Sequence, residues 1–292
     1  MAWHPTWNEP PQRPRPAFMT DRGGSFPPGV KVILLVTVGV YFADYFTGGA
    51  LSRFGSLSVR DLLHFEIWRL FTYMFLHGGV GHIFINMFIF WMIGRTLERQ
   101  LGTRQFLWMY FVAGVAGGLL EVAFNVVMHF EHGPLMTRQG PILFLDIPAV
   151  GASAGVAGVM VAFATINPRA IFLLFFFLPI QARWLALIYM IIETRHMLVG
   201  LQTGWADGVA HAAHVGGMVV GFVWVKWGHR LARALPKRPR RDRGPLFSRG
   251  RDRDREELDR ILDKVRREGV GSLSMREKMF LQEMGGKFRD GP

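Results

Sequence analysis

The sequence of 292 residues contains no cysteine. This absence excludes a disulfide framework, a thiolate metal site and a cysteine nucleophile. Acidic residues are also few, with 22 Asp and Glu against 34 Lys and Arg, so the formal net charge is +12. Much of the basic excess lies in residues 237–255, directly after the last apolar segment, and this run carries almost no aromatic side chain for base stacking. We therefore expect it to contact anionic lipid and to report membrane topology, and we expect no nucleic-acid partner.

The beginning of the sequence lacks the apolar core of a signal peptide. Residues 1–28 are rich in proline and contain scattered arginines, so we expect a disordered cytosolic leader. Residues 29–230 are mostly apolar, which predicts one integral-membrane domain. We expect a basic linker over 231–254 and a short helical module over 255–292 to follow it.

Hydrophobic residues make up 50% of the chain and are concentrated in six stretches. A membrane-spanning helix needs about 20 apolar residues. The stretches that approach this length are 30–46, 81–96, 106–128, 149–166, 171–192 and 205–227. They predict an all-α membrane protein built as a bundle of six transmembrane helices. Residues 47–80 are too polar to span but carry enough Leu, Phe and Trp to lie in the membrane interface.

Six spans place both termini on the same side of the membrane. The arginines of residues 94–104 and Arg169, in the second–third and fourth–fifth connections, lie on that side too. Because Lys and Arg are enriched in cytoplasmic loops, we expect both termini in the cytoplasm. We expect a bacterial inner membrane, since the leader has few of the serines typical of a transit peptide. Glu98, near the inner end of the second span, is expected to form a cap or to pair with a neighbouring loop.

Polar side chains interrupt three of the apolar stretches. Ser153 follows Gly151 at the start of one, and His214 lies in another. His82 and Asn86 share one helical face of a third, at i and i+4. Polar groups inside a bilayer are costly to hold and are functional candidates by default. At about 1.5 Å per residue, Ser153, His82 and His214 all fall in the outer half of the bilayer, which predicts one site at one depth.

These residues have the chemistry of a serine hydrolase. A serine hydroxyl is a weak nucleophile until a base takes its proton, and histidine is the usual base. Small residues on both segments, including Gly217 and Gly221 in a GxxxG pattern, let their helices approach closely. His82, Asn86 and the Ser153 amide could donate hydrogen bonds to an oxyanion. The alternatives are ordinary packing faces around an incidental serine, and a polar clamp formed by His82 and Asn86.

A carboxylate partner for the histidine is not evident. No acidic residue falls near His214 in an apolar segment, and Asp207 lies about two turns away, so we expect a Ser–His dyad. Four imidazoles are present in His77, His82, His211 and His214, but no HExxH helix and no carboxylate complete a hydrolytic zinc site. We therefore expect no metal and no cofactor. His211 is expected to pack beside His214, and His77 to organise the loop that enters the second span.

Taken together, these segments resemble the rhomboid intramembrane serine proteases over residues 26–229. The resemblance is carried by the order and spacing of four motifs: Trp68-Arg69, His82-Ile-Phe-Ile-Asn86, Gly151-Ala-Ser153 and Ala213-His214-Val-Gly-Gly217. It implies that Ser153 is the nucleophile and that His214 is the base and acid. It also implies that His82, Asn86 and the Ser153 amide form an oxyanion hole.

The resemblance implies the substrates as well. They would be single-pass membrane proteins cut in or near their transmembrane segments, because a helical peptide bond must unwind before it is attacked. Trp68 and Arg69 would belong to a first loop that lies partly in the membrane. The outer half of the fifth helix and the loop after it would gate substrate entry. The lipid bilayer is the other expected partner, and the oligomeric state is left open.

Two positions depart from the family pattern. Many members have glycine directly after the serine, where this chain has Ala154 followed by Gly155. Some members place an aromatic residue four positions after the serine to pack on the histidine. Here that residue is Ala157, which leaves the support of the His214 ring open. A catalytically silent member that binds membrane proteins is the alternative function, and a transporter is disfavoured because the polar groups cluster in one half of the bilayer.

The end of the chain has a different character. Beyond Arg255, apolar residues repeat at helical spacing up to Gly269. The sequence from Ser274 to Glu277 then predicts a capping box that opens a second short helix. This helical pair is similar to a short C-terminal module of some bacterial rhomboids. An amphipathic tail resting on the membrane surface is the alternative.

Overall fold

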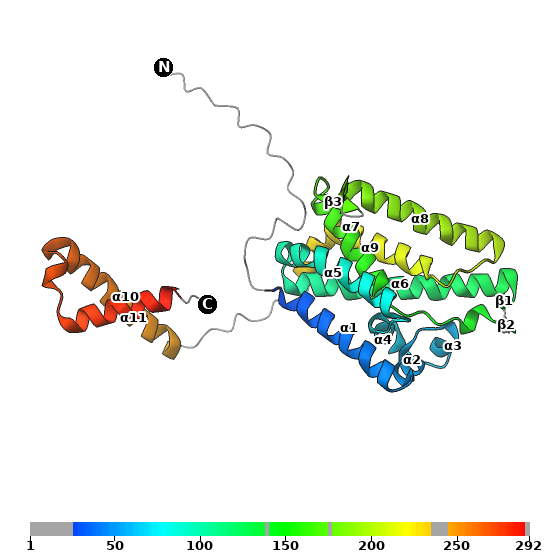
Figure 1. The fold of residues 1–292 in the computed structure, drawn as a ribbon, viewed down its shortest axis with the longest axis horizontal. Coiled ribbons are helices and arrows are strands. Elements are labelled where there is room, and N and C mark those ends of the chain that lie inside the picture. The colour runs from blue at the N-terminus through cyan, green and yellow to red at the C-terminus, as the bar shows by residue number, and fades with distance from the viewer. Residues whose placement is uncertain (1–25, 138–139, 175–176, 235–244, 290–292) are drawn as a thin grey trace, which may run out of the picture. The chain divides into compact units, whose positions relative to one another are not determined.

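The computed structural model describes residues 26–137, 140–174, 177–234 and 245–289. The chain divides into two compact units, Met1–Ala234 and Leu235–Pro292, which are described one at a time (Figure 1). The leader predicted over residues 1–28 lies almost wholly outside the described residues.

The first unit is a helical bundle with short connecting elements. Its long helices are α1 (Pro28–Phe46), α5 (Val80–Leu101), α6 (Thr103–His132), α7 (Ser153–Ile166), α8 (Ala182–Thr203) and α9 (His211–Ala234). Short elements connect them: α2 (Ala50–Gly55), α3 (Val59–Leu63), α4 (Arg69–Thr72), η2 (Tyr73–Phe75) and η3 (Phe144–Asp146). Two antiparallel hairpins complete the described elements, β1 (Leu135–Thr137) with β2 (Gly140–Ile142) and β3 (Ile171–Leu174) with β4 (Leu178–Gln181).

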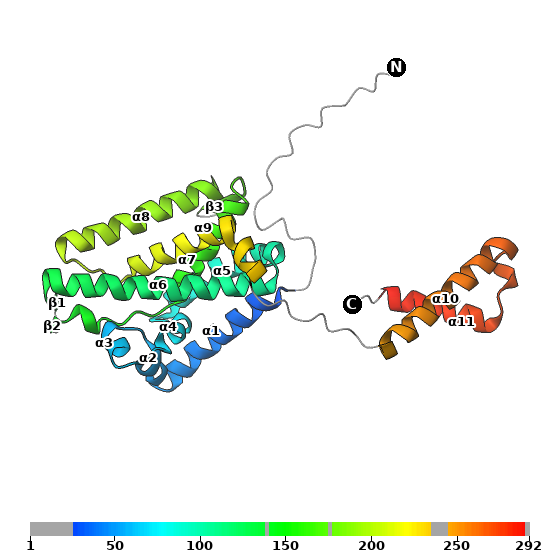
Figure 2. The ribbon, with the colours of Figure 1, turned by 180° about the vertical axis from the view of Figure 1, so that it is seen from behind.

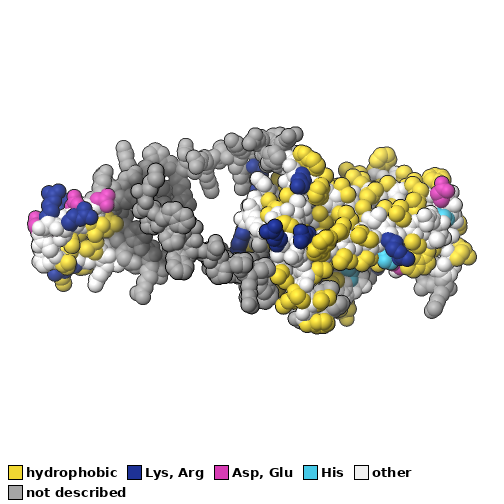
Figure 3. All heavy atoms as spheres, turned by 90° about the horizontal axis from the view of Figure 1, so that it is seen from above, with side chains coloured by type: hydrophobic (Ala, Val, Ile, Leu, Met, Phe, Trp, Pro, Cys, Tyr) yellow, Lys and Arg dark blue, Asp and Glu magenta, His cyan; other side chains and the backbone are white. Residues whose placement is uncertain are grey.

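Four helices of the described residues, α1, α5, α6 and α8, are long and apolar enough to cross a membrane. Helix α7 is apolar but has only 14 residues. Helix α9 has 24 residues but is not among the four, and its sequence includes three histidines and Lys226. The structure therefore gives four clear spans where six were predicted. Large apolar side chains are exposed on α1 and α8, and the face of this unit drawn in Figure 3 is largely hydrophobic, as expected for a surface in contact with lipid.

Helix α7 lies at the centre of the bundle, with α1 and α8 on opposite sides (Figures 1 and 2). Every residue from Ala154 to Ala164 is buried. Glycines let the neighbouring backbones touch: a Cβ on Gly217 of α9 would lie 2.0 Å from the Ala154 carbonyl oxygen, and one on Gly221 would lie 2.1 Å from that of Gly158. The close approach predicted between these two segments is therefore confirmed. It places the start of α7 against the first turns of α9.

The fifth predicted span, 171–192, is displaced toward the C-terminus. Residues 171–174 and 178–181 pair as β3 and β4, with Ile171 opposite Gln181, so the helix begins at Ala182 and ends at Thr203. Pro179 explains the difference, because proline inside a helix removes a hydrogen bond and clashes with the preceding turn. The fourth span begins at Ser153 and the sixth at His211, a few residues later than predicted.

Glu98 caps the first helix. Its carboxylate accepts hydrogen bonds from the backbone N–H groups of Gly29 (2.8 Å) and Val30 (2.7 Å) at the start of α1. Thr103 donates to the same carboxylate at 2.7 Å. The first N–H groups of a helix have no partner within the helix, and a negative charge is favourable at that end. The expected capping role of Glu98 is confirmed.

The second unit is a pair of helices, α10 (Pro245–Glu268) and α11 (Met275–Arg289), joined through η4 (Val270–Ser272). Helix α10 begins ten residues before Arg255, so part of the stretch predicted as a linker is helical; residues 235–244 lie outside the described residues. Gly269, with φ of 82°, ends α10 as predicted. The capping box is also confirmed, since the Ser274 N–H donates to Glu277 at 2.8 Å and the Glu277 N–H donates to Ser274 Oγ at 3.3 Å.

Candidate active site

Ser153 is the first residue of α7, at the end of a tightly held loop. Gly151, two residues earlier, has φ of 133°, a conformation that favours glycine. Its N–H donates to the Tyr73 carbonyl at 2.9 Å. Four residues before Ser153, Ala149 exchanges two backbone hydrogen bonds with Leu57, at 2.7 and 3.0 Å. The serine therefore sits at a helix N-terminus, where the positive end of the helix dipole favours negative charge.

The His82 side chain lies against the same glycine. A Cβ at position 151 would be 2.9 Å from Cε1 and 3.0 Å from Nε2 of His82, and 3.4 Å from Ser153 Oγ. The imidazole and the hydroxyl thus approach one small space that any larger residue at position 151 would fill. Asn86 is buried one turn further along α5, and its Nδ2 donates to the His82 carbonyl at 2.9 Å. One of the two N–H bonds of this amide is therefore already used.

His77 packs between His82 and the loop before Ser153. Its ring centroid lies 4.9 Å from that of His82, and its Nε2 is 3.5 Å from the Ala152 backbone nitrogen. Burial, with the neighbouring His82 as a second cause, lowers the pKa of His77 to about 4. A neutral ring is therefore present at pH 7, with Nε2 able to accept the Ala152 N–H. His77 holds the chain one residue before the serine.

His214 is buried in the second turn of α9 and has partners on α8. Glu193 Oε2 lies 2.9 Å from His214 Nδ1, and the Tyr189 hydroxyl lies 3.3 Å from the same nitrogen. The expectation that no carboxylate lies near His214 is wrong. It failed because the fifth span was ended at Ile192, which assigned Glu193 to a loop. An acidic residue one turn after a tyrosine, at the end of the apolar run 184–192, was the signal that could have found it.

No hydrogen bond joins Ser153 to His214 in the described part of the chain. Their helices touch nearby, because Ala154, directly after Ser153, is in backbone contact with Gly217, three residues after His214. Catalytic hydrogen bonds are often long before substrate binds and tighten in the reacting complex.

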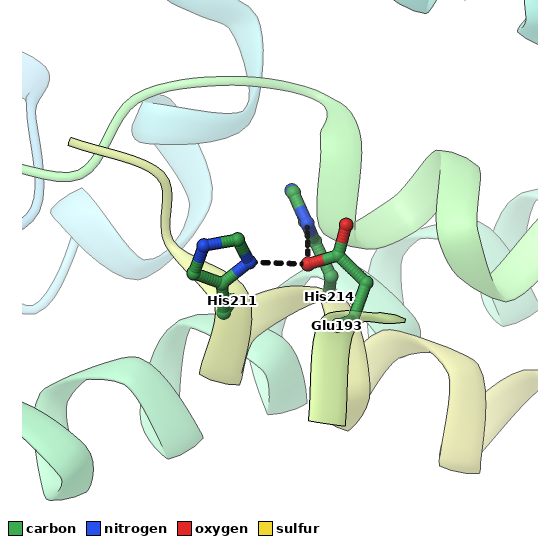
Figure 4. A group of neighbouring side chains, drawn as sticks. All are labelled: Glu193, His211 and His214. Atoms are coloured by element: carbon green, nitrogen blue, oxygen red, sulfur yellow. Dashed lines mark hydrogen bonds and ion pairs between the residues drawn. The ribbon is translucent and has the colours of Figure 1, made fainter. Parts of the chain in front are cut away.

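His211 shares the carboxylate of Glu193 with His214. Its Nδ1 lies 2.7 Å from Glu193 Oε2 (Figure 4). Its Nε2 lies 3.1 Å from Asp207 Oδ2. The His196 ring stacks on it at a centroid distance of 4.8 Å. Nitrogen and oxygen atoms of Glu193, His211 and His214 lie within 4.8 Å of one another. A carboxylate does therefore join two of the four imidazoles, contrary to the expectation from the sequence.

Glu121 of α6 is a second buried carboxylate that the sequence reasoning missed. Its Oε2 accepts the backbone N–H of Ala213 at 3.1 Å, and its Oε1 is 3.4 Å from Asn125 Nδ2. It thus satisfies an N–H group in the first turn of α9, immediately before His214. We interpret it as a positioning group for that turn.

Trp68 and Arg69 support the site from a distance. Buried Arg69 donates to the carbonyls of Ser56 (2.7 Å) and Arg53 (3.1 Å). The indole of Trp68 stacks on Phe54 at 5.5 Å. Both residues fold the segment 47–79 onto itself, and this segment reaches the Ser153 loop through the pairing of Leu57 described above.

Two protein families match parts of this chain. Residues 64–230, more than half of the chain, match the rhomboid domain family. Residues 247–287 match a family of unknown function, DUF6576. RHOMBOID-like protein 1 of Arabidopsis thaliana is 32% identical over 59% of this chain and 38% of the relative. Rhomboid protease GluP of Bacillus subtilis is 25% identical over 59% of this chain and 28% of the relative.

Not every relative is described as a protease. Inactive RHOMBOID-like protein 8 of Arabidopsis thaliana is 35% identical over 27% of this chain and 22% of that protein. The chain thus covers less than two fifths of each relative named here. The match of the membrane unit and its apolar helices nevertheless identify the chain as an integral membrane protein that belongs to the rhomboid family.

Proposed function

We propose that this chain is an intramembrane serine endopeptidase in which Ser153 is the nucleophile and His214 the general base and acid. The observation that carries the proposal is the 2.9 Å contact of Glu193 with Nδ1 of His214, behind a serine at the N-terminus of α7. A carboxylate on Nδ1 holds the proton on that nitrogen and leaves Nε2 free to accept one. The proposed dyad is therefore supported by an acidic third residue.

The reaction follows from these positions. His214 Nε2 takes the proton of the Ser153 hydroxyl while Oγ attacks the peptide carbonyl carbon. The carbonyl oxygen becomes an oxyanion, for which His82, Asn86 and the Ser153 N–H are the donors. His214 then gives its proton to the leaving amine, and an acyl-enzyme forms. Water repeats the cycle with the same base and releases the second product.

Single-pass membrane proteins are the proposed substrates. A serine at the start of a short, enclosed helix cannot reach a peptide bond within an intact transmembrane helix, whose backbone groups are all paired. The substrate segment must therefore unwind at the site. Helix α8, on one side of the bundle, presents exposed Ile188, Ile191 and Leu198. We propose that α8 and the loop 204–210 form the side by which the substrate enters. We also propose that this side faces the outer surface of a bacterial inner membrane and that both termini lie in the cytoplasm.

A catalytically silent rhomboid is the second candidate. It is favoured by the similarity to an inactive relative and by the missing hydrogen bond between Ser153 and His214. Such a protein would bind membrane proteins without cutting them.

The test is cleavage of a single-pass transmembrane substrate in proteoliposomes. Wild-type protein is compared with Ser153→Ala and with Ser56→Ala, a serine replacement in the first loop. We expect the wild type and Ser56→Ala to release the product at similar rates and Ser153→Ala to release none. Equal cleavage by Ser153→Ala would overturn the assignment. Binding of the substrate without cleavage by any of the three would favour the silent alternative.

A further inference from the structure

The cluster of Glu193, His211 and His214 contains one imidazole that the proposed reaction does not use (Figure 4). The proposed hydrolysis needs a carboxylate beside Nδ1 of His214 and no second histidine beside that carboxylate. His211 nevertheless directs its own Nδ1 at the same oxygen, Glu193 Oε2, at 2.7 Å. The side chains of Glu193, His211 and His214 are 8%, 14% and 10% exposed, so this second imidazole is held in a largely enclosed position.

The donor atoms suit a divalent transition metal. Two imidazole nitrogens and a carboxylate oxygen form one of the common three-residue ligand sets of Zn²⁺, with a fourth position left for water. Metal–ligand bonds of about 2.0–2.1 Å require the donors to stand about 3.3 Å apart. The observed separations from Glu193 Oε2 are 2.7 and 2.9 Å, a few tenths of an ångström short of this spacing, and all three donor atoms lie within 4.8 Å of one another.

Asp207 provides a separate indication. Its Oδ2 lies 3.1 Å from Nε2 of His211, the nitrogen that faces away from Glu193. Histidines that bind metals usually donate the N–H of the other ring nitrogen to a carboxylate, which fixes the tautomer. Asp207 thus holds the proton on Nε2 of His211, so that the lone pair of Nδ1 is available to a metal once the proton on Nδ1 has left. Its side chain is 26% exposed, in a loop whose neighbouring residues are exposed, so a hydrated cation has a path to the cluster.

We propose that Glu193, His211 and His214 form an inhibitory site for a divalent transition metal, with Zn²⁺ the best match to the ligand set. The metal would bind Nδ1 of both rings, and each neutral ring would then carry its proton on Nε2. In His211 that proton faces Asp207. In His214 it occupies the nitrogen that must take the proton of Ser153, so the base is blocked while the metal is bound. The proton that His211 Nδ1 shares with Glu193 is released to solvent when the metal takes its place and Nε2 is already protonated.

The inhibitory effect rests on the proposed protease function, whereas metal binding does not. Binding is therefore measured first, on full-length Ser153→Ala protein in detergent, by calorimetric titration of the chelator-treated protein with Zn²⁺. We expect one ion per chain. His211→Asn in the same background should weaken binding at least about 10-fold, and Asp207→Asn about 10- to 100-fold. His64→Asn, at an exposed histidine of the first loop, should bind as Ser153→Ala does.

Inhibition is measured on the protease in proteoliposomes. Zn²⁺ should stop cleavage by the wild type, and a chelator should restore it. His211→Asn should raise the inhibitory Zn²⁺ concentration at least about 10-fold, each variant being compared with its own metal-free rate. Absence of stoichiometric binding, or binding unchanged in His211→Asn, would overturn the site. Binding without inhibition of an active protease would overturn the inhibitory role. If the chain binds Zn²⁺ but cuts no substrate, the proposed metal site stands and the proposed protease function is wrong.

Discussion

Glu193 Oε2 lies 2.9 Å from Nδ1 of His214 and joins the middle of α8 to the start of α9. The support of the His214 ring, which Ala157 left open in the sequence, is this contact with a carboxylate. The ring is also approached by the Tyr189 hydroxyl at 3.3 Å. The orientation of the base therefore depends on α8, which is also the helix proposed to admit the substrate.

Replacement of this carboxylate by an amide tests its role. In Glu193→Gln, the amide can donate to Nδ1, which shifts the imidazole proton to Nε2. We expect kcat to fall by about 10²- to 10⁴-fold with little change in KM, because Glu193 contacts the base and not the substrate. Steady-state cleavage in proteoliposomes measures both, with Glu131→Gln at the exposed end of α6 as the control. Activity within twofold of the wild type would show that His214 does not need the carboxylate.

His82 gives a second prediction. Its imidazole and the Ser153 hydroxyl approach the same space at Gly151, where an oxyanion would form. His82→Ala should lower kcat by about 10²- to 10³-fold while labelling of Ser153 by a small probe persists. His64→Ala, at an exposed histidine, should retain the wild-type rate. An unchanged kcat in His82→Ala would assign this residue to packing alone.

The contact between α7 and α9 predicts a large effect on stability. In Gly217→Ala, the new Cβ would lie 2.0 Å from the Ala154 carbonyl oxygen, and backbone cannot move as cheaply as a flexible side chain. We expect the free energy of unfolding to fall by about 1–3 kcal/mol or more. Gly39→Ala on α1 is the matched control, since nothing lies within 4 Å of its Cβ. Thermal unfolding in detergent distinguishes them, and equal midpoints would contradict the close packing.

The second unit should respond to acid through Glu277. Hydrogen bonds from Ser274, first its N–H, and the ammonium of Lys264 lower the pKa of this carboxyl to about 2 from an ordinary 4.5. The folded state therefore favours the charged form, so its contribution to stability is complete above pH 4.5 and is lost as the pH falls from 4.5 toward 2. In Glu277→Gln this dependence of stability on pH should disappear, and the amides of α10 and α11 should be less protected from hydrogen exchange at neutral pH.

Hydrogen exchange of peptides from α10 and α11, compared between wild type and Glu277→Gln at each pH, measures this effect in the full-length protein. Comparison at equal pH cancels the intrinsic dependence of exchange. The same slope in both proteins between pH 4.5 and 2 would show that other groups control the unit.

Much of the architecture could be predicted because its signals are local. Apolar stretches marked three of the four clear spans, α1, α5 and α6, whereas the fourth, α8, was predicted too early in the chain. The glycines at 217 and 221 indicated close packing, and Ser274 with Glu277 formed the predicted capping box. The β3–β4 hairpin could not be predicted from hydropathy, since a short pair of apolar strands and an apolar helix have the same mean hydropathy. Pro179 was the cue that distinguished them.

The error in that helix carried over to the site. With its end placed at Ile192, Glu193 was excluded from the bundle, although it is buried. Glu121 was missed for a different reason: its partner, the Ala213 N–H, is a backbone group that leaves no mark in the sequence. Contacts between helices distant in the chain depend on rotation about each helix axis, which spacing alone does not fix.

The most direct test of the account is labelling of Ser153 by a serine-directed fluorophosphonate in the detergent-purified protein. The wild type is compared with Ser153→Ala and His214→Ala, after treatment with a chelator. We expect the wild type to be labelled and labelling to vanish in both variants, because the hydroxyl reacts only when His214 takes its proton. Equal labelling of all three proteins would contradict it.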